Sequence, residues 1–259
     1  MKNLTRSVAS LALLLALSAC KSETPATPSE TVQTVPEKTA SIELERPGLE
    51  KKVEIKSVPE WSVKRSIPKY PEARDDQTRN GIEYLLFDDQ YRYNLGGYEY
   101  ASRAVFRVSD RKGLEAAAQI KKSFDPTLSN LSFNYINIIR DGKTVDRLPE
   151  VEIREIQQES GLGKGIIDGD ITALINLEDV RVGDIIDYSY SGQVTTPLYP
   201  DMFFTSSSTS YSVPVARTII SIDMPRDKRL YSETIKSKTR VKIKDEGDRT
   251  LYTLSLIHI

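Results

Sequence analysis

Residues 179–191 read DVRVGDIIDYSYS, and this stretch decides the fold. Gly183-Asp184 favours a turn, and the residues after it repeat with a period of two. Apolar and polar residues alternate: Ile186, Tyr188 and Tyr190 form the apolar row, and Asp187, Ser189 and Ser191 form the polar row. This pattern predicts a half-buried strand that follows a turn.

Arg181, inside the same stretch, can pair with Asp179 or Asp184 on the outside of the turn. Such surface pairs contribute under ~1 kcal/mol. A turn joined to a strand therefore points to maintenance of the fold more than to catalysis.

The same period of two recurs along the chain from about Gly81 onward. Four further apolar rows show it: Ala104, Phe106 and Val108, with Arg103 and Arg107 opposite; Leu131, Phe133 and Tyr135, between Ser132 and Asn134; Ile220, Ile222 and Met224; and Val241 and Ile243, with Arg240, Lys242 and Lys244 facing out. Asp141-Gly142 predicts a tight hairpin turn, and residues 245–248 predict another. Many strands with turns between them predict an antiparallel β-sandwich.

A single helix is expected over Lys112–Lys122, where Leu114, Ala117 and Ala118 form a narrow apolar stripe. The predicted fold class is therefore all-β or mainly β, an antiparallel β-sandwich with one short helix. A signal peptide and a disordered linker are expected to precede it.

The first twenty residues read as an export signal. Lys2 and Arg6 supply positive charge, and Leu11–Leu17 is an apolar run too short to span a membrane. The following Leu17–Cys20 (LSAC) resembles the lipobox of bacterial lipoproteins, in which the Cys thiol is lipidated and becomes the first mature residue. We predict a lipoprotein signal peptide over 1–19 and lipidation at Cys20, which anchors the chain in a membrane. The alternative is an ordinary signal peptide in which Cys20 has no role.

Residues 20–60 are predicted to be a flexible tether. They hold no aromatic residue, and Pro25, Pro28, Pro36 and Pro47 are scattered among Thr, Ser, Glu and Lys. A short strand at 53–56 is an alternative within this segment. The β-sandwich domain is expected over 61–253.

The last six residues, 254–259 (LSLIHI), match a translation of the transposase mosaic-end sequence used in sequencing adapters. We expect them to be an adapter artefact and the domain to be truncated at about Thr253. The alternative is a genuine apolar strand.

Composition excludes several classes of function. The chain carries 36 Lys and Arg against 37 Asp and Glu, so it lacks the basic surplus that a nucleic-acid partner needs. Its one Cys cannot form an internal disulfide. Its one His is His258, inside the suspected artefact, so a Cys–His or Ser–His nucleophile is not expected. We predict no catalytic residue, no cofactor and no metal site.

Other motifs are weak. Residues 161–165 (GLGKG) lack the Ser/Thr and the first Gly of a phosphate loop, and Ser62 to Arg65 fails the S-x-x-K pattern. Asp168 and Asp170, with Glu178 and Asp179, do not have EF-hand spacing. Residues 205–212 (TSSSTSYS), including Ser206–Ser208 and Ser210, resemble a polar loop. The chain's 13 tyrosines could form a sugar-binding face, but Tyr also suits half-buried strands.

A family resemblance rests on particular stretches: residues 81–86 (GIEYLL), 123–126 (SFDP), 139–143 (IRDGK), 168–169 (DG) and 179–190 (DVRVGDIIDYSY). Together they resemble the family called domain of unknown function 3857, from about Trp61 onward. The sequence departs from the family pattern at residues 195–197 (TTP), where Asn-Pro is expected, and at Asn134, where relatives carry His. These departures argue against a site at either position.

In that family the domain lies before a transglutaminase-like Cys-His-Asp domain in exported or membrane-attached bacterial proteins. The resemblance therefore implies a non-catalytic accessory domain that positions substrates for acyl transfer or peptide-bond cleavage by a missing neighbour. A stand-alone glycan- or protein-binding module, with peptidoglycan or an envelope protein as partner, and a purely structural lipoprotein are the alternatives. The expected location is the periplasm-facing cell envelope. Lys21 rather than Asp after Cys20 resembles an outer-membrane address.

Overall fold

The computed structural model describes residues 53–68, 78, 80–157, 169–207, 211, 213–233 and 239–257. All of them belong to the unit Pro47–Ile259. Cys20, His258 and the loop 161–165 lie outside the described residues. Within the described part of the chain, no helix has the length and hydropathy needed to cross a membrane.

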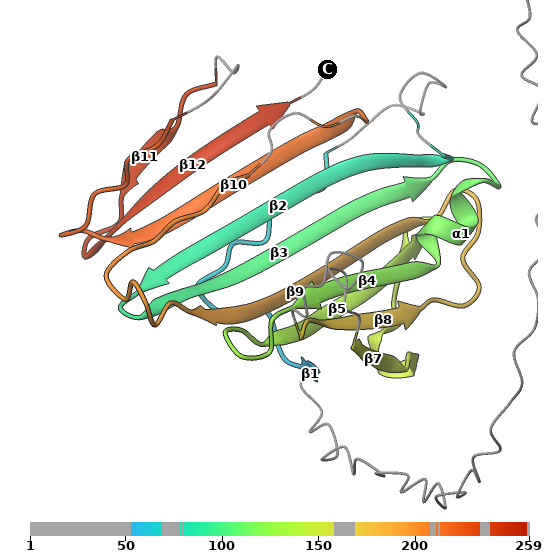
Figure 1. Ribbon diagram of the computed structural model, residues 1–259. Coiled ribbons are helices and arrows are strands. Elements are labelled where there is room, and N and C mark those ends of the chain that lie inside the picture. The colour runs from blue at the N-terminus through green and yellow to red at the C-terminus, as the bar shows by residue number, and fades with distance from the viewer. Residues whose placement is uncertain are drawn as a thin grey trace, which may run out of the picture. The chain divides into compact units, whose positions relative to one another are not determined.

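Two β-sheets form the fold (Figure 1). The large sheet has the strand order β1-β5-β9-β3-β2-β10-β12-β11, with β6 paired to β5. Its strands are β1 (Val53–Ile55), β2 (Ile82–Asn94), β3 (Gly97–Val108), β5 (Leu131–Arg140), β6 (Lys143–Asp146), β9 (Ile185–Thr195), β10 (Val215–Pro225), β11 (Lys242–Asp245) and β12 (Arg249–Ile257). The small sheet has the order β4-β8-β7, with strands β4 (Gln119–Phe124), β7 (Ile153–Gln157) and β8 (Ile171–Asn176).

The main core lies between these sheets, because one face of the large sheet is apolar at every second residue. Phe106 and Ile186 of the large sheet are buried with Ile120 and Ile175 of the small one. The predicted mainly β sandwich is confirmed. The alternation along β9 is also confirmed, because Ile186 and Tyr188 are buried in this core.

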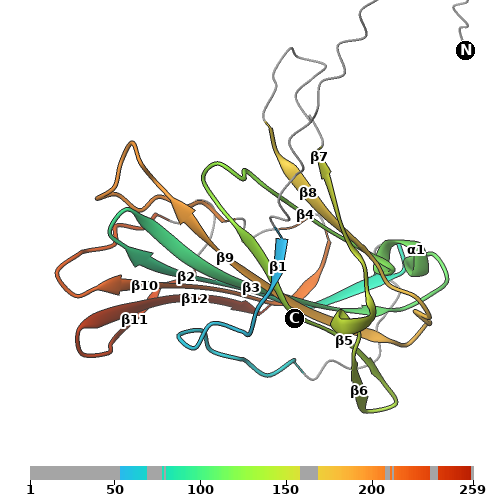
Figure 2. The ribbon, with the colours of Figure 1, turned by 90° about the horizontal axis from the view of Figure 1, so that it is seen from below.

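The opposite face of the large sheet is covered too. Residues 56–68, which we name the strap, cross this face on the side away from β4, β7 and β8 (Figure 2). Ile67 of the strap packs against a second buried cluster that includes Leu86, Val105 and Ile219. The polar side of the strands therefore faces a covered surface and not open solvent.

Two pairings of the large sheet depart from the expected antiparallel order. β1 runs parallel to β5, and β10 runs parallel to β2. Hairpin turns signal only antiparallel neighbours, so these long-range pairings left no local pattern in the sequence. The strand considered at 53–56 is present as β1, and Val53 is buried in the main core. The folded part therefore starts ahead of Trp61, the expected boundary.

The expected helix at 112–122 is shorter than predicted. The α-helix α1 spans Gly113–Ala117, and residues 119–124 form β4. Ile120 and Phe124 point into the core while Gln119 is exposed, so a period of two and pairing with β8 override the helical stripe. A 3-10 turn, η2 (Leu148–Glu150), connects β6 to β7.

Three local predictions can be compared with the structure: the turn at Asp141-Gly142 and the inward positions of Tyr135 and Ile243. The turn at Asp141-Gly142 is confirmed, since both residues have positive φ angles, 50° and 74°. Tyr135 does not continue the inward row of Leu131 and Phe133, because an irregularity between Phe133 and Tyr135 moves it to the strap side. Ile243 on the edge strand β11 is 67% exposed and does not face in. β12 runs through residues 254–257 beside β10.

Candidate functional site

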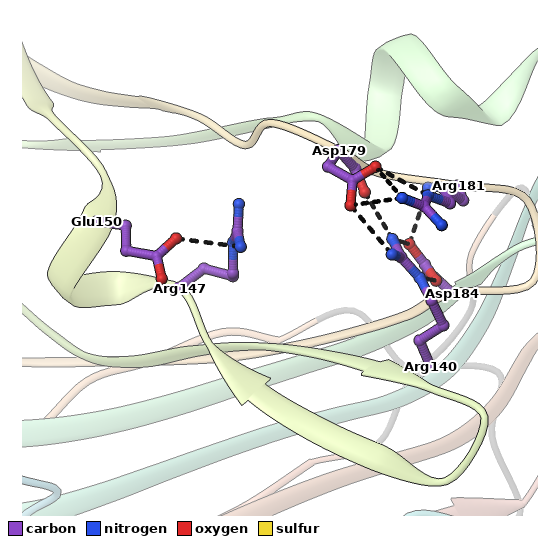
Figure 3. A network of polar contacts seen from close by, with 6 residues as sticks. All are labelled: Arg140, Arg147, Glu150, Asp179, Arg181 and Asp184. Atoms are coloured by element: carbon purple, nitrogen blue, oxygen red, sulfur yellow. Dashed lines mark hydrogen bonds and ion pairs between the residues drawn. The ribbon is translucent and has the colours of Figure 1, made fainter.

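Arg140, Asp179, Arg181 and Asp184 form the signature cluster, which gathers the residues of the family-like motifs (Figure 3). Arg140 ends β5, and Asp184 directly precedes β9. Nε and Nη2 of Arg140 each donate to one carboxylate oxygen of Asp184, both at 2.7 Å. This is a bidentate fork, the strongest geometry for an arginine–carboxylate pair.

Asp179 completes the cluster from the surface. It accepts from Arg140 Nη1 at 3.1 Å and from Arg181 Nε at 2.8 Å, and its backbone oxygen accepts from Arg140 Nη2 at 2.6 Å. The backbone N–H of Arg181 donates to Asp184 at 2.8 Å. Each terminal nitrogen of Arg140 is therefore already used, so this arginine closes the turn onto β5.

The turn itself requires unusual backbone angles. Gly183 has a φ of 95°, and its N–H donates to the Val108 carbonyl, while Val108 N–H donates to the carbonyl of Asp184. Asp179 also has a positive φ, 54°. The motif thus fixes the loop before β9 against the end of β3.

Electrostatics support a structural role for this cluster. Burial alone would raise the pKa of Asp184, but the hydrogen bonds from Arg140 and from the Arg181 backbone hold that pKa below its ordinary value. The hydrogen bonds from Arg140 and Arg181 also lower the pKa of Asp179. Both carboxylates are therefore kept ionised, which suits an ion pair and not a general acid at neutral pH.

An open groove of about 230 Å³ lies beside the cluster. Arg140 and Asp179 line one part of the groove, and Lys143 lines it from the β5–β6 hairpin. Arg147 lines the groove as well and pairs with Glu150 at 3.1 Å (Figure 3). Lys143 and Arg147 can contact an acidic group, but among its lining residues the groove has no thiol, hydroxyl or imidazole that could act as a nucleophile.

Asp187 forms a second fork three residues further along the motif. Arg103 Nε and Nη2 donate to its two oxygens, both at 2.8 Å, and Tyr135 donates at 3.3 Å. Both members of the ion pair are buried. Arg103 also donates to the backbone oxygen of Arg65 in the strap, so this fork joins β3 and β9 to the segment that covers them.

Further bonds hold the strap to the sheet. Val63 exchanges two hydrogen bonds with the side chain of Gln90, at 2.8 and 2.9 Å. Trp61 Nε1 donates to Glu99 at 2.8 Å. The strap therefore sits in one register along β2 and β3, although its sequence has no strand period.

Arg65 provides the strap's ion pair. Its Nη1 lies 2.9 Å from Asp88, and its Nη2 donates to Ser221 of β10 at 2.8 Å. Burial raises the pKa of Asp88, although Arg65 counteracts it.

Tyrosines gather on the other face of the large sheet, where they form the tyrosine cluster. It comprises Tyr91, Tyr98, Tyr100, Tyr188 and Tyr190. Tyr91 and Tyr98 meet edge to face at 5.9 Å between ring centroids, Tyr100 and Tyr190 at 6.3 Å, and Tyr188 stacks on Tyr190 at 6.2 Å. Four of these rings are half-buried and Tyr188 is buried, which agrees with the expectation that Tyr suits half-buried strands.

Charged and polar groups complete the tyrosine cluster. Lys122 of β4 donates to the Tyr190 hydroxyl at 3.0 Å and lies 4.2 Å from the centroid of its ring. Asp89 accepts from Ser102 at 2.7 Å. Burial raises the pKa of Asp89, while Ser102 and Lys122 pull it down.

The phenols of the cluster influence one another. Burial and the charge of Asp89 raise the pKa of Tyr91 to about 12 and that of Tyr190 to about 12. Burial and then the neighbouring phenols raise the pKa of Tyr100 as well. The ring contacts and the bonds of Lys122 and Asp89 bring several hydroxyls, one carboxylate and one ammonium to this part of the sheet. Aromatic edges beside hydrogen-bonding groups of both kinds suit a polyhydroxylated ligand.

The remaining sequence candidates are dispersed. Asn134 donates to Ser191 at 2.9 Å and to the carbonyls of residues 56 and 57, so it ties the strap to β5 and β9. Thr195 donates to the Leu128 carbonyl. Ser62 bonds to Pro59, and Ser206 and Ser207 are exposed. Asp168, Ser208 and Ser210 lie outside the described residues.

Glu178 and Asp179, considered above as calcium ligands, lie on the loop that leads to β9. No group of three or more His, Cys, Asp or Glu side chains in the described part of the chain is arranged to hold a metal ion.

Sequence reasoning missed the partners that make these clusters. The sequence shows Arg140 and Arg103 but not their partners, because the carboxylates that bind them lie 44 and 84 residues away along the chain. Lys122 and Asp89 carried no motif at all. One signal was present, because an Arg opposite a buried apolar row, as Arg103 is, needs a carboxylate once its own face is covered.

Comparison with known proteins places the chain in a family. The family model described as "Domain of Unknown Function with solved-structure structure (DUF3857)" matches residues 95–259 of the sequence. The chain therefore belongs to this family. The match includes four of the five motif stretches and begins after residues 81–86. A search of curated proteins found no match.

Among 85 matching chains of solved structures is one from Parabacteroides distasonis, described as a "putative protease". The superposition has a TM-score of 0.61 at 15% sequence identity and covers 70% of this chain, which shows a shared fold. This chain spans only 36% of the length of that one.

Proposed function

We propose that this chain is a non-catalytic accessory domain that positions substrates for a transglutaminase-like Cys-His-Asp domain of the same protein. The observation that carries the proposal is the signature cluster. Its carboxylates and the terminal nitrogens of Arg140 are bonded to one another, so the most specific motif closes a turn and presents no free nucleophile or base.

Two further facts support this role. The chain has one Cys, at position 20, and one His, at position 258, so a thiolate–imidazole pair for acyl transfer is expected to come from another part of the protein. The solved structure that shares the fold belongs to a longer chain described as a protease, of which this fold is a fraction.

We also propose that Cys20 is lipidated and holds the domain at the periplasmic side of the envelope, in the outer membrane. The apolar run and the small residues before Cys20 support this assignment. Radiolabelled palmitate should enter the natural protein and not its Cys20→Ser variant. Equal labelling of both would overturn the lipid assignment without affecting the accessory role.

The accessory role is tested first by a long genomic read through codon 253 and several hundred codons beyond. The expected result is an open frame that encodes a Cys, a His and an Asp in a second domain. A native stop codon directly after this domain would contradict the proposal. Deletion of the β-sandwich from the full protein should then lower kcat/KM for peptide substrates, while replacement of the distant Cys should abolish turnover.

A stand-alone glycan-binding module is the second candidate, and the tyrosine cluster is the specific observation that favours it. Saturable binding of peptidoglycan fragments that is lost in Tyr98→Ala and Lys122→Met would support it. Tyr231→Ala is the matched control, because Tyr231 is exposed and lies outside the cluster. Absence of both binding and a catalytic neighbour would leave a structural lipoprotein.

A further inference from the structure

The turn between β2 and β3 meets the loop after β9 at one end of the large sheet (Figure 1). Large exposed apolar residues lie on both. Five of them are each 61–84% exposed, and we name them the apolar tip: Leu95, Leu198, Tyr199, Met202 and Phe204. Scattered single exposed apolar residues are ordinary, but five on two adjoining turns need an explanation.

Hydrogen bonds hold these two turns together. Gly96 donates to the Pro200 carbonyl at 2.8 Å, and Thr196 donates to the Gly96 carbonyl at 2.9 Å. Tyr93 donates to the same Pro200 carbonyl at 3.3 Å. The loop and the hairpin therefore form one built surface.

Phe203 fixes the direction in which the neighbouring side chains point. Its ring lies 5.3 Å from that of Tyr98 and 6.1 Å from that of Tyr91, so it is packed against the tyrosine cluster. Met202 and Phe204, on either side of it, are directed to solvent. The tip thus exposes apolar groups while its backbone is anchored beneath them.

We propose that the apolar tip inserts into the interfacial layer of a lipid bilayer. The chemistry of the tip fits this partner, because Leu, Met and Phe can enter the acyl boundary while Tyr199 keeps its hydroxyl among the headgroups. Asp201 is the only charged side chain in residues 94–97 and 195–205, so little charge has to be desolvated.

The size of the tip argues for lipid and against a protein partner. Specific protein interfaces use about 20–30 residues a side, and five side chains on two turns cannot supply such an area. A bilayer needs no complementary surface. In one respect the inference rests on the proposed function: a lipid on Cys20 would keep the tip close to a membrane.

The test uses the chain from residue 20 onward with Cys20→Ser, so that no lipid is attached. Flotation with vesicles of phosphatidylethanolamine and phosphatidylglycerol should carry the protein upward, and added salt should have little effect. Phe204→Ser should lower the partition coefficient about tenfold or more, because one fully buried Phe side chain is lost. Leu198→Ser added to it should abolish flotation.

Ile243→Ser is the matched control, since Ile243 is 67% exposed, within the range of the tip residues, but lies on β11, outside the tip. Unchanged circular dichroism of each variant excludes unfolding as the cause. No flotation of the parent, or flotation that the tip variants do not alter, would overturn the inference. So would a dimer that Phe204→Ser dissociates, because the tip would then bind a second copy. Palmitate labelling of Cys20 tests the anchor separately, so the two failures are distinguishable.

Discussion

Asp184 and Asp187 stand three residues apart in one motif, yet each binds an arginine from a different strand. Asp184 pairs with Arg140 at the rim of the sheet, where the Arg140 side chain is 30% exposed. Asp187 takes Arg103 beneath the strap, where both side chains are buried. The geometry of the two forks is nearly the same and both carboxylates are buried, so the exposure of the arginine is what separates them. A buried ion pair is costly to break, whereas a half-exposed one can be rehydrated.

The largest effect is expected at the buried fork. Arg103→Met should lower the free energy of unfolding by about 3–5 kcal/mol at pH 7, because it leaves Asp187 charged and unpaired in the interior. Urea denaturation of the unlipidated chain measures this change. The double variant Arg103→Met/Asp187→Leu should recover at least half of the loss, since it removes both charges. A single variant as stable as the parent would show that water reaches Asp187.

The rim fork should respond less and with a clear dependence on pH. Asp184→Asn should cost about 2 kcal/mol at pH 7, because the hydrogen bonds to a charged group are weakened. The folded-state pKa of Asp184 lies below its ordinary value of 3.8. Its stabilising contribution is therefore complete above that value and is lost as the pH falls through the lower, folded-state pKa. The gap between parent and variant should be constant from pH 7 to 5 and shrink in stronger acid.

Asp88 beneath the strap gives the opposite slope and serves as the control. Burial raises its folded-state pKa above 3.8, so its ionisation costs stability as the pH rises from 3.8 through that pKa. The gap between parent and Asp88→Asn should therefore change in the reverse direction. Parallel pH profiles for the two variants would contradict the assignment of different environments.

The sequence revealed what is local in these regions. Alternation predicted β9, and Asp141-Gly142 predicted the hairpin between β5 and β6, because side-chain periodicity and positive φ leave a pattern within a few residues. The covering of the polar face could not be predicted, since the strap binds through hydrogen bonds from Val63 and Trp61 to side chains of other strands. Because the sequence does not reveal the strap, Arg103 is predicted to be an exposed residue, although the structure buries it.

The candidate sites show the same limit. Tyrosines were noticed as a class, but only strand order brings Tyr91 of β2, Tyr98 of β3 and Tyr190 of β9 together. The two parallel pairings that extend the sheet join segments far apart in the chain. Within the motif, Asp179 and Asp184 close a turn, while Tyr188 and Tyr190 belong to the tyrosine cluster. The other members of that cluster, and its Lys122 and Asp89, lie outside every motif.

The smallest effect is expected at the edge of the strap, where Trp61 meets Glu99. Glu99→Ala removes the acceptor of the indole N–H and should cost about 1 kcal/mol, because a half-buried neutral donor can find water instead. Trp61 is the only tryptophan of the chain, so its fluorescence reports this contact directly. The emission should shift to the red before global unfolding begins. Glu60→Ala, an exposed neighbour on the strap, should leave the spectrum unchanged. If emission and circular dichroism of Glu99→Ala changed at the same urea concentration, the strap and the sheet would unfold as one unit. The fork beneath the strap and the fork at the rim would then be lost in the same unfolding transition.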